Sequence, residues 1–446
     1  MKKLLSALIV LFFIAGSLSA LDFSTKPHGV CTKDFFRDVL SPNLLNIDEG
    51  YSACAAKVLI DKEEVFPVSL ELMSKAKKSI FFQMYLFGGN LGDQIIDLLE
   101  KKMDEGVKVC LILSKTNKSL EEAEKRERKV FEKLHKLEEK GTPAVKPPYL
   151  QKVSRALASR IPVVILDTDL LKGGAPIKVD HSKLIIVDGI YAVTGGMNFA
   201  DSVAANHDSM VMLAGPIVKT LERVFINNWM LGYARDCKSM EFYNHADAMV
   251  TMKARIADGW LESNGCVTLT TPYRYDTRDK LIKIIDGARE SIELEMLIAN
   301  EDDVLKALAR AAKRGVKVRI ILDPATFLYG FDWKGGVNNK AVGLFQKLKE
   351  QNPKIDAEVR FYAINPGQEL HLKLIVVDND IVGMGSTNFT DGAFASNYEL
   401  YCFFKGPKLA SKYLEVFNND WQKRTKTAPK VNLARKIITI FADLIF

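Results

Sequence analysis

The feature that most constrains this 446-residue chain is an internal repeat. Three segments of the first half return in the second half in the same order, 76–87 as 288–299, 106–113 as 315–322 and 181–189 as 371–379. Each copy runs to roughly 170–190 residues, which is the size of a domain and far longer than the repeat of a solenoid. The chain is therefore predicted to contain two copies of one domain.

Within each copy, short β-branched runs alternate with amphipathic stretches. Residues 107–113 and 183–189 are typical of buried strands. Residues 91–106 place their apolar side chains on one helical face and end on Gly106, which suits a helix C-terminus. This alternation predicts an α/β fold in which two similar sheets carry helices on the outside. Two copies of one unit usually pack about a pseudo-two-fold axis, so matching residues are expected to meet at the interface.

The N-terminus has the pattern of a secretory signal peptide. Lys2 and Lys3 precede an apolar run from Leu4 to Ala15, and small residues follow up to Ala20. The run is short for a membrane span, although an uncleaved signal anchor is the alternative. Both readings predict export to the periplasm or outside the cell, with membrane association left open. The predicted parts are a signal peptide at 1–20, an N-terminal extension at 21–60, repeats at 61–240 and 245–429, and a tail at 430–446.

The charge of the chain favours anionic partners. The formal net charge is +7, or +5 without Lys2 and Lys3, and this mild excess suits lipid surfaces or nucleic acid without choosing between them. Residues 421–436 contain six basic residues and no acidic one, and residues 437–446 are nearly all apolar. The tail is predicted either to bind an anionic membrane surface or to dock on the protein core as an amphipathic helix.

The six cysteines show no CxxC spacing, which argues against a zinc site. Cys110 and Cys402 lie in apolar, strand-like runs and are expected to be buried thiols. In an oxidising compartment, the other four could form the disulfides Cys31–Cys54 and Cys237–Cys266.

The residues that carry chemistry form one constellation that occurs twice. His181, Lys183 and Asp188 follow the pattern H-x-K-x-x-x-x-D, and Asn198 comes shortly after. The second copy consists of His371, Lys373, Asp378, Ser386 and Asn388. The interval between the two histidines equals that between the two asparagines, at 190 residues. Chance does not place a constellation of this size twice in the same register.

The spacing within each motif has a physical reason. Residues two apart on a strand point to the same face, so His181 projects with Lys183 and His371 with Lys373. An ammonium beside an imidazole is a place for a phosphate oxygen. If the halves face each other, two histidines, two lysines and two asparagines can bind one phosphodiester and stabilise its developing charge. The spacing of a metal-binding motif is absent, so neither a metal nor another cofactor is expected.

The doubled motif resembles the signature of the phospholipase D superfamily, and the resemblance extends from about residue 60 to residue 425. It implies two similar α/β sandwich halves with the active site between them. It also implies a two-step reaction without a metal, in which one histidine attacks phosphorus and the other protonates the leaving oxygen and then activates water or an acceptor alcohol. By similarity His181 is the nucleophile and His371 the general acid, although the symmetry of the repeat allows the reverse order.

The resemblance also assigns roles to the rest of the motif. Asp188 and Asp378 are counted with the catalytic residues, although in the superfamily they are mainly structural. The side chains expected to hold or support the phosphate are Lys183, Lys373, Asn198, Asn388 and Ser386.

Two acids, Asp208 and Glu399, stand at matching places after each motif. A carboxylate there can accept the second ring N–H of a catalytic histidine and fix its tautomer. The first copy has the shorter acid. Its neighbour His207 is expected either at the rim of the site or in a loop.

Three functions fit these observations. The leading prediction is an exported, monomeric phosphodiesterase that acts on phospholipids by hydrolysis or phosphatidyl transfer. The second is a metal-independent endonuclease of the same superfamily, for which nucleic acid would be the partner and binding would depend steeply on salt. The third is a binding or host-interaction protein that keeps the fold without catalysis, because fold alone does not imply function.

Overall fold

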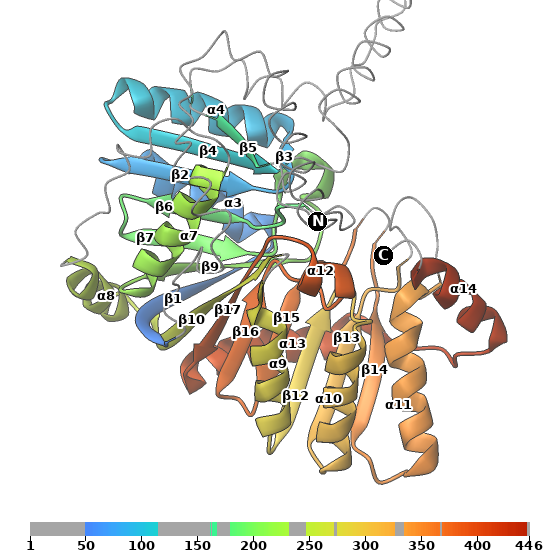
Figure 1. The fold of residues 1–446 in the computed structure, drawn as a ribbon. Coiled ribbons are helices and arrows are strands. Elements are labelled where there is room, and N and C mark those ends of the chain that lie inside the picture. The colour runs from blue at the N-terminus through green and yellow to red at the C-terminus, as the bar shows by residue number, and fades with distance from the viewer. Residues whose placement is uncertain are drawn as a thin grey trace, which may run out of the picture.

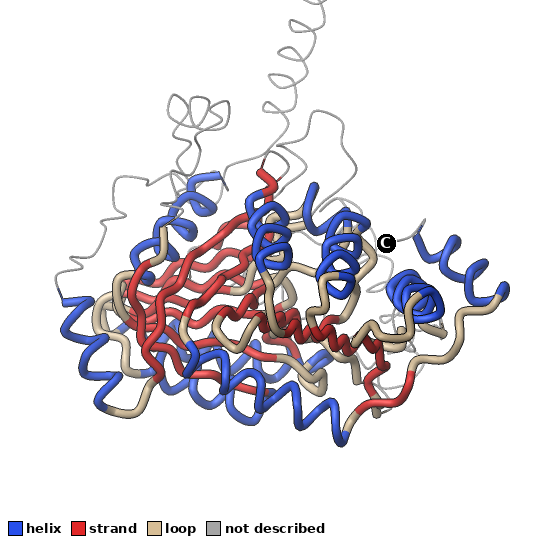
Figure 2. Tube along the Cα trace, turned by 90° about the horizontal axis from the view of Figure 1, so that it is seen from below, coloured by secondary structure: helices blue, strands red, loops and turns tan. Residues whose placement is uncertain are grey.

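A computed structural model of the protein describes residues 50–114, 161, 163–166, 179–231, 247–271, 274–325, 334–365 and 368–443. The predicted signal peptide and most of the predicted N-terminal extension lie outside these residues. The described chain forms one long twisted sheet with helices on both faces (Figure 1), and Figure 2 shows the same layers from below. The expected α/β architecture is confirmed.

Each half contains the same succession of elements. The first half consists of β1 (Ser52–Ile60), α3 (Asp61–Ser74), β2 (Ser79–Met84), α4 (Gly89–Asp104), β4 (Lys108–Ser114), β5 (Val163–Leu166), β6 (Leu184–Val187), β7 (Tyr191–Gly195), β9 (Ser209–Ala214) and α7 (Ile217–Leu231). The second half consists of β10 (Leu261–Thr271), α9 (Asp276–Gly287), β12 (Ser291–Met296), α10 (Asp302–Lys313), β13 (Lys317–Leu322), α11 (Asn339–Gln351), β14 (Ala357–Tyr362), β15 (Lys373–Val377), β16 (Ile381–Gly385), β17 (Glu399–Lys405) and α13 (Pro407–Lys423).

Shorter elements decorate this frame. Among the described residues they are β3 (Phe87–Gly88), β8 (Phe199–Ala200), α8 (Ala248–Ala257), β11 (Arg274–Tyr275), α12 (Asp391–Ala395), β18 (Thr425–Thr427) and α14 (Leu433–Asp443).

The strand order has the expected pseudo-two-fold symmetry. From one end the second half runs β14-β13-β12-β15-β16-β17-β10, and from the other end the first half runs β5-β4-β2-β6-β7-β9-β1. The halves meet where β1 pairs antiparallel with β10. Counted over the described residues, the result is one 16-stranded sheet. The two similar sheets expected from the sequence are joined into one, because the first strands of the two halves hydrogen-bond to each other.

The strand β1 belongs to the segment that the sequence suggested was an N-terminal extension. It pairs with β9 on one side and β10 on the other, so its described residues form the first strand of the first half. Cys54 in β1 and Cys266 in β10 are buried free thiols, as are Cys110 and Cys402. Cys31 and Cys237, the other partners in the two predicted disulfides, lie outside the described residues. Because Cys54 and Cys266 are free thiols inside the core, neither pairing is formed, whereas the buried thiols predicted at Cys110 and Cys402 are confirmed.

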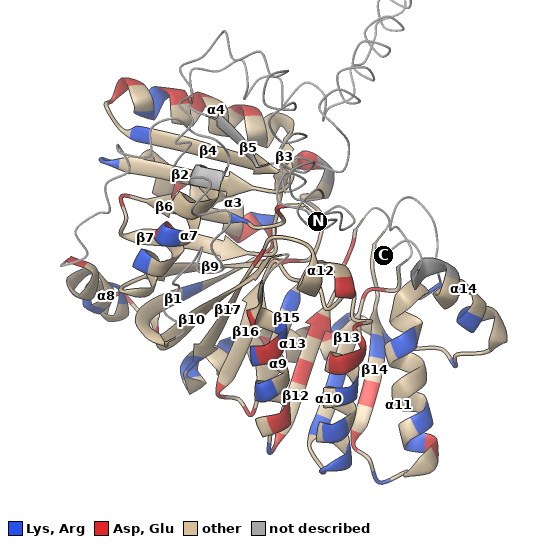
Figure 3. Cartoon of the chain, in the orientation of Figure 1, with Lys and Arg blue, Asp and Glu red and all other residues tan. Residues whose placement is uncertain are grey.

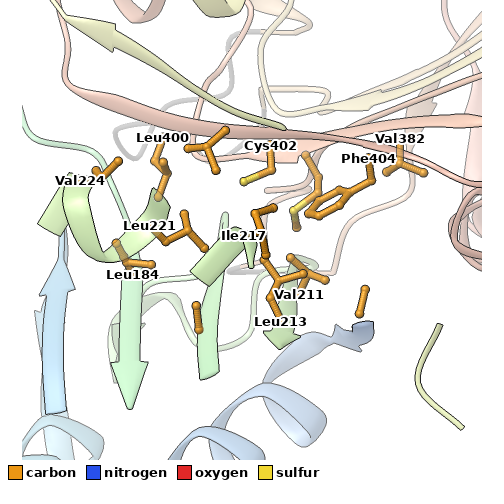
Figure 4. Packing of buried hydrophobic residues seen from close by; sticks show 14 of the residues in the cluster. Leu184, Val211, Leu213, Ile217, Leu221, Val224, Val382, Leu400, Cys402 and Phe404 are labelled. Atoms are coloured by element: carbon orange, nitrogen blue, oxygen red, sulfur yellow. The ribbon is translucent and has the colours of Figure 1, made fainter. Parts of the chain in front are cut away.

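Apolar clusters on the two faces of the sheet hold the helices. On one face α7 and α13 cover both halves, and their cluster includes Ile217 and Leu221 of α7 together with Leu400 and Phe404 of β17 (Figure 4). On the other face α3 and α4 cover the first half, and α9, α10 and α11 cover the second. Because one cluster contains strands from both halves, burial of apolar surface holds the two halves together. Charged residues follow the helices α9, α10 and α11 (Figure 3).

The motif aspartates stabilise two hairpin turns. Asp188 follows β6 with φ +56, and its carboxylate accepts the backbone N–H groups of Lys77, Lys78 and Ser79 at 2.6–3.1 Å. Asp378 follows β15 with φ +53 and accepts three N–H groups in the same way, from residues 289–291. Each carboxylate therefore ties a turn to the start of the neighbouring strand.

Candidate active site

The two His-Lys pairs lie at the seam between the halves. His181 lies three residues before β6 and donates its backbone N–H to the carbonyl of Tyr398 at 2.8 Å. His371 lies two residues before β15 and donates its backbone N–H to the carbonyl of His207 at 2.8 Å. Each motif is thus hydrogen-bonded to the segment that follows the motif of the other half, and this exchange brings the two histidines into one site.

Each imidazole is oriented by a carboxylate from the opposite half. Nδ1 of His371 lies 2.5 Å from Oδ2 of Asp208. Nδ1 of His181 lies 3.0 Å from Oε2 of Glu399 and 3.0 Å from the carbonyl oxygen of Ser386. Both rings are 8% exposed. With Nδ1 donating to a carboxylate, Nε2 is the ring nitrogen left for chemistry.

The side chains that carry the two carboxylates differ in length and in the hydrogen bonds that they accept. Glu399 accepts the hydroxyl of Ser386 at 2.5 Å and the amide of Asn397 at 2.9 Å. Asp208 accepts the backbone N–H of Ser209 at 2.7 Å. The counterpart of Ser386 in the first half is Gly196, where an added Cβ would lie 2.3 Å from Oδ1 of Asp208. The glycine leaves room for the shorter acid, so both acids reach a histidine.

Both motif lysines are buried and point back at their own histidines. The ammonium of Lys183 donates to the carbonyl of His181 at 2.6 Å, and that of Lys373 to the carbonyl of His371 at 2.6 Å. Burial lowers the pKa of Lys183 to about 7 and the pKa of Lys373 to about 8, although nearby carboxylates including Glu399 oppose the shifts. Lys373 lowers the pKa of Lys183 further, which places the two cations near each other.

The imidazoles share this environment. Burial, with the charge of Lys373, lowers the pKa of His371 to about 4 against the opposing effect of Asp208. Burial also lowers the pKa of His181, assisted by Lys183 and Lys373 and opposed by Glu399. Buried cations that lower each other's pKa form a site that is stabilised when an anion such as a phosphodiester binds.

The two asparagines differ in their contacts. Oδ1 of Asn198 accepts the backbone N–H of Leu86 at 3.2 Å, which orients its amide. Asn388 is half-buried, and its Oδ1 has no hydrogen-bond partner within the described part of the chain. The sequence did not single out Tyr85, whose ring lies edge-on to His181 at 4.6 Å and under the ammonium of Lys183 at 4.9 Å. Its only signal was an aromatic residue directly after a strand of the repeat.

The aspartates of the motif stand apart from this group. Asp188 lies at the opposite end of β6 from His181, and Asp378 lies at the opposite end of β15 from His371. Their carboxylates are engaged by backbone N–H groups of the turns. Counting them with the catalytic residues is therefore corrected, because they stabilise the strands that carry the histidines and do not contact the imidazoles.

His207 is neither at the rim nor in an open loop. It is 1% exposed, its Nδ1 lies 2.8 Å from Oδ1 of Asp61, and its Nε2 lies 2.8 Å from Oδ2 of Asp420. Burial opposes a positive charge there, but the hydrogen bonds to Asp420 and Asp61 outweigh it and raise the pKa of His207 to about 10. Glu295 completes this buried cluster, where burial followed by the charge of Asp420 raises the pKa of its carboxyl. The sequence analysis missed the cluster.

Comparison with known families identifies the repeated unit. A family model described as "Cardiolipin synthase, PLD-like domain" matches residues 70–229 and again residues 281–421. The two matches cover the two halves and include both His-Lys-Asp motifs.

Similar proteins occur in several bacteria. Cardiolipin synthase 2 of Bacillus anthracis is 24% identical over 390 residues, which are 83% of this chain and 65% of the relative. Cardiolipin synthase A of Pseudomonas syringae pv. syringae is 24% identical over 408 residues, which are 85% of this chain and 69% of that protein. The chain thus spans 65% of the length of the Bacillus relatives.

One solved structure has the same fold over most of its length. The crystal structure of phosphatidylserine synthase from Haemophilus influenzae Rd KW20 aligns with a TM-score of 0.61. The alignment covers 89% of this chain and 97% of that one, at 14% sequence identity. A likeness at this level of identity establishes the shared architecture.

Proposed function

The chain belongs to the phospholipase D superfamily, and on this premise we propose that it is a phosphodiesterase that acts on phospholipids through a phosphohistidine intermediate. The observation that supports this proposal most directly is the exchange of carboxylates between the halves, Asp208 to His371 and Glu399 to His181. It leaves two Nε2 atoms and two ammonium groups in one buried site. A two-step displacement at phosphorus needs a nucleophile, an acid that becomes a base, and cations around the phosphate.

In the first step Nε2 of His181 attacks phosphorus, and an N–P bond forms as the bond to the leaving oxygen breaks. The pKa of His371 is lowered to about 4 in the free protein, and the bound phosphodiester anion raises it, so that His371 carries a proton on Nε2 and gives it to that oxygen. Asp208 stabilises the imidazolium that serves as the acid, because its carboxylate accepts the Nδ1–H. Lys183 and Lys373 balance the charge that develops on the phosphoryl oxygens. The symmetry of the site permits the same step with the two histidines exchanged.

In the second step His371 takes a proton from the acceptor hydroxyl, whose oxygen attacks phosphorus as the N–P bond breaks. Water as the acceptor gives hydrolysis, and an alcohol gives phosphatidyl transfer. The matched relatives are named cardiolipin synthases. This name favours a phospholipid substrate and is consistent with transfer, and the proposal includes hydrolysis as the outcome when water is the acceptor.

The tail supplies a candidate contact with the lipid surface. Within the described residues, none of the helices is both long and apolar enough to cross a bilayer. In α14, however, Leu433 is 73% exposed, Ile440 63% and Ile437 46%. The opposite side of the helix docks on the protein, where Thr439 donates to the carbonyl of Gly336 at 3.2 Å. We propose that the protein is exported and that it uses the exposed apolar side of α14 on an anionic membrane.

A lipid-release assay with matched variants tests the function. The purified chain would be given phospholipid vesicles and, separately, plasmid DNA, as wild type, His181→Ala and His371→Ala. His245→Ala, which removes a histidine outside both motifs, is the control. The expected result is that only the wild type and the control release headgroup or phosphatidic acid. If the protein also catalyses transfer, an added alcohol should yield the phosphatidyl ester of that alcohol in place of phosphatidic acid. Cleavage of DNA but not lipid, lost in both motif variants, would replace the proposal by a nuclease.

The membrane contact and export have separate tests. Replacing Leu433, Ile437 and Ile440 by serine should weaken sedimentation with anionic vesicles and leave turnover of a soluble phosphodiester unchanged. Val250→Ser, on the exposed surface of α8 with 68% of the side chain accessible, is the control. Fractionation of cells that produce the full chain should find it outside the cytoplasm. Equal vesicle binding by the triple variant, or recovery only from the cytoplasm, would remove the respective claim.

A further inference from the structure

A second cluster of buried functional groups lies behind the His-Lys site. It consists of His207, Glu295 and Asp420, which are 1%, 0% and 1% exposed. One potential ligand atom from each of them lies within 4.8 Å of the others. His207 precedes β9 in the first half, Glu295 lies in β12, and Asp420 lies in α13. An imidazole nitrogen and two carboxylates form a donor set suited to Zn²⁺ and similar divalent transition metals.

The burial of Glu295 is not explained by its protein contacts within the described residues. Neither of its carboxyl oxygens has a hydrogen-bond partner in the described part of the chain, although the side chain is fully buried. A buried carboxyl group without a hydrogen bond is costly in either protonation state, and buried charges are ordinarily paired or coordinate metals. Figure 3 shows acidic residues along β12, which lies in the sheet between α9 and α10 in this view.

The surroundings of His207 match those of a metal-ligating histidine. Nδ1 faces Asp61 at 2.8 Å, so a carboxylate fixes the ring and leaves Nε2 directed at Asp420 and Glu295. A histidine that binds a metal through one nitrogen commonly donates from the other to a carboxylate in this way. Nε2 of His207 and Oδ2 of Asp420 are 2.8 Å apart, and metal bonds of about 2.0–2.2 Å to each would require them to separate by roughly half an ångström.

The other half of the molecule provides an internal comparison. The repeat aligns β2 with β12 and α7 with α13, which places Gln83 opposite Glu295 and Asn228 opposite Asp420. Gln83 donates to Asp180 at 2.7 Å and accepts from Asn228 at 3.2 Å. The first half therefore fills this position with a hydrogen-bonded amide pair. The second half has carboxylates at both places. His207 pairs with Asp420, but Glu295 has no such partner within the described residues, and that difference leaves a place for a cation.

A cavity and a guanidinium lie beside the cluster. A cavity of about 460 Å³ is lined by Asp61, Tyr362 and Arg424 among other residues, so it opens next to His207. Nη1 of Arg424 lies 3.5 Å from Oδ1 of Asp420. With a dication bound, the carboxylates of Asp61, Glu295 and Asp420 would be neutralised by the ion together with this guanidinium. The cavity thus brings solvent close to the neighbours of His207, and a bound ion would balance the charge of buried carboxylates, as is usual for such groups.

We propose that His207, Glu295 and Asp420 bind one divalent transition-metal ion, with Zn²⁺ as the fitting probe, in a structural site separate from the His-Lys pair. The site links strands and helices of both halves. Its ligand His207 directly precedes Asp208, and the backbone N–H of Asp208 donates to Asp61 at 3.0 Å. The ion therefore fixes the segment whose carboxylate orients His371, which makes the ligands positioning residues and not catalytic ones.

Metal counting tests this proposal without reference to turnover. Untagged full-length protein would be stripped with EDTA, dialysed against Zn²⁺, freed of loose metal by gel filtration and analysed by mass spectrometry for bound metal. The key variant is Glu295→Gln/Asp420→Asn, which copies the amide pair of the first half. Asp180→Asn is the control, because it removes the buried carboxylate that accepts a hydrogen bond from Gln83, the first-half counterpart of Glu295.

Wild type and Asp180→Asn should each retain about one Zn²⁺ per chain, and Zn²⁺ should raise their unfolding temperature, because a ligand that binds only the folded state stabilises it. The double variant should lose both effects. Absence of tightly held Zn²⁺ from the folded wild type, or equal retention by the folded double variant, would overturn the proposal. If the double variant does not fold, Zn²⁺ retention and the unfolding temperature are measured on Glu295→Gln alone, with the same two outcomes. Because metal is counted directly, the result stands even if the protein does not cleave phospholipids.

Discussion

Asp208 of the first half lies 2.5 Å from Nδ1 of His371 in the second half. The reciprocal contact, from Glu399 to His181, spans 3.0 Å. The acid that follows each motif in the sequence therefore orients the histidine of the other half, and neither half contains an oriented histidine by itself. The proposed active site is therefore formed only when both domains are present.

Isosteric loss of either carboxylate should reduce turnover. Asp208→Asn and Glu399→Gln replace an acceptor by an amide that can present N–H to Nδ1, which favours the wrong tautomer of the imidazole. A fall in kcat of roughly 10³- to 10⁴-fold, with little change in KM, is expected from the effect of such a change in catalytic triads. Steady-state kinetics on vesicles or a soluble phosphodiester, together with thermal unfolding, measures it. A large loss of stability with an unchanged kcat would show that the acids only hold the fold.

Gly196→Ala should imitate the loss of Asp208. The new Cβ would lie 2.3 Å from Oδ1 of Asp208, so the carboxylate would have to leave His371. Ser386→Ala is the matched change in the second half, and it removes one hydroxyl donor from Glu399 without a steric conflict. The alanine at position 196 should therefore reduce kcat far more than the alanine at position 386. Equal kinetics for the two variants would contradict the proposed crowding.

Asp188→Ala should cost stability and spare the chemistry. The carboxylate accepts three backbone N–H groups, and loss of such charge-assisted bonds should lower the free energy of unfolding by about 3 kcal/mol. Asp188→Asn keeps one acceptor and tolerates the positive φ of 56, so it should lose less. Denaturant unfolding and intermediate trapping below the new unfolding temperature measure the two effects. A stable Asp188→Ala protein that forms no intermediate would return this residue to the catalytic group.

The pH dependence of kcat/KM should reveal the titration of the two buried lysines. In the free protein the pKa values of Lys183 and Lys373 are lowered to about 7 and about 8, mainly by burial. Their ammonium charges are complete below these values and are lost as the pH rises through them, so kcat/KM should fall between pH 7 and pH 8. A bound phosphodiester anion raises both pKa values, so the fall in kcat should lie at higher pH. If kcat/KM and kcat fell over the same alkaline pH range, the assignment of this fall to Lys183 and Lys373 would be contradicted.

The repeat made much of the fold predictable. Since the His, Lys and Asn residues recur at one interval, the symmetry and the meeting of the two motifs could be inferred before any coordinates were known. The junction of the two sheets could not be inferred from the sequence, because the pairing of β1 with β10 depends on backbone hydrogen bonds that no side-chain pattern records. The exchange of Asp208 and Glu399 was hidden for a related reason, since it depends on how the halves face each other.

Departures from the repeat were harder to interpret. Glu295 and Asp420 are single changes from Gln83 and Asn228 at positions outside the motif, and their significance appears only when the fold brings them to His207. The cysteine pairings failed because a count of cysteines does not distinguish a thiol inside a sheet from one that can reach a partner.

The most direct test of the central claim is to trap the intermediate with a p-nitrophenyl phosphodiester, whose good leaving group needs no acid. In His371→Ala the first step should proceed and the second should stall for lack of a base. Rapid quenching should then show one equivalent of nitrophenolate per chain, and mass spectrometry should locate the phosphoryl adduct on His181. If the order of the histidines is reversed, His181→Ala should carry the adduct on His371 instead. Turnover without an adduct on either histidine, or an adduct that persists in the double variant, would contradict the account.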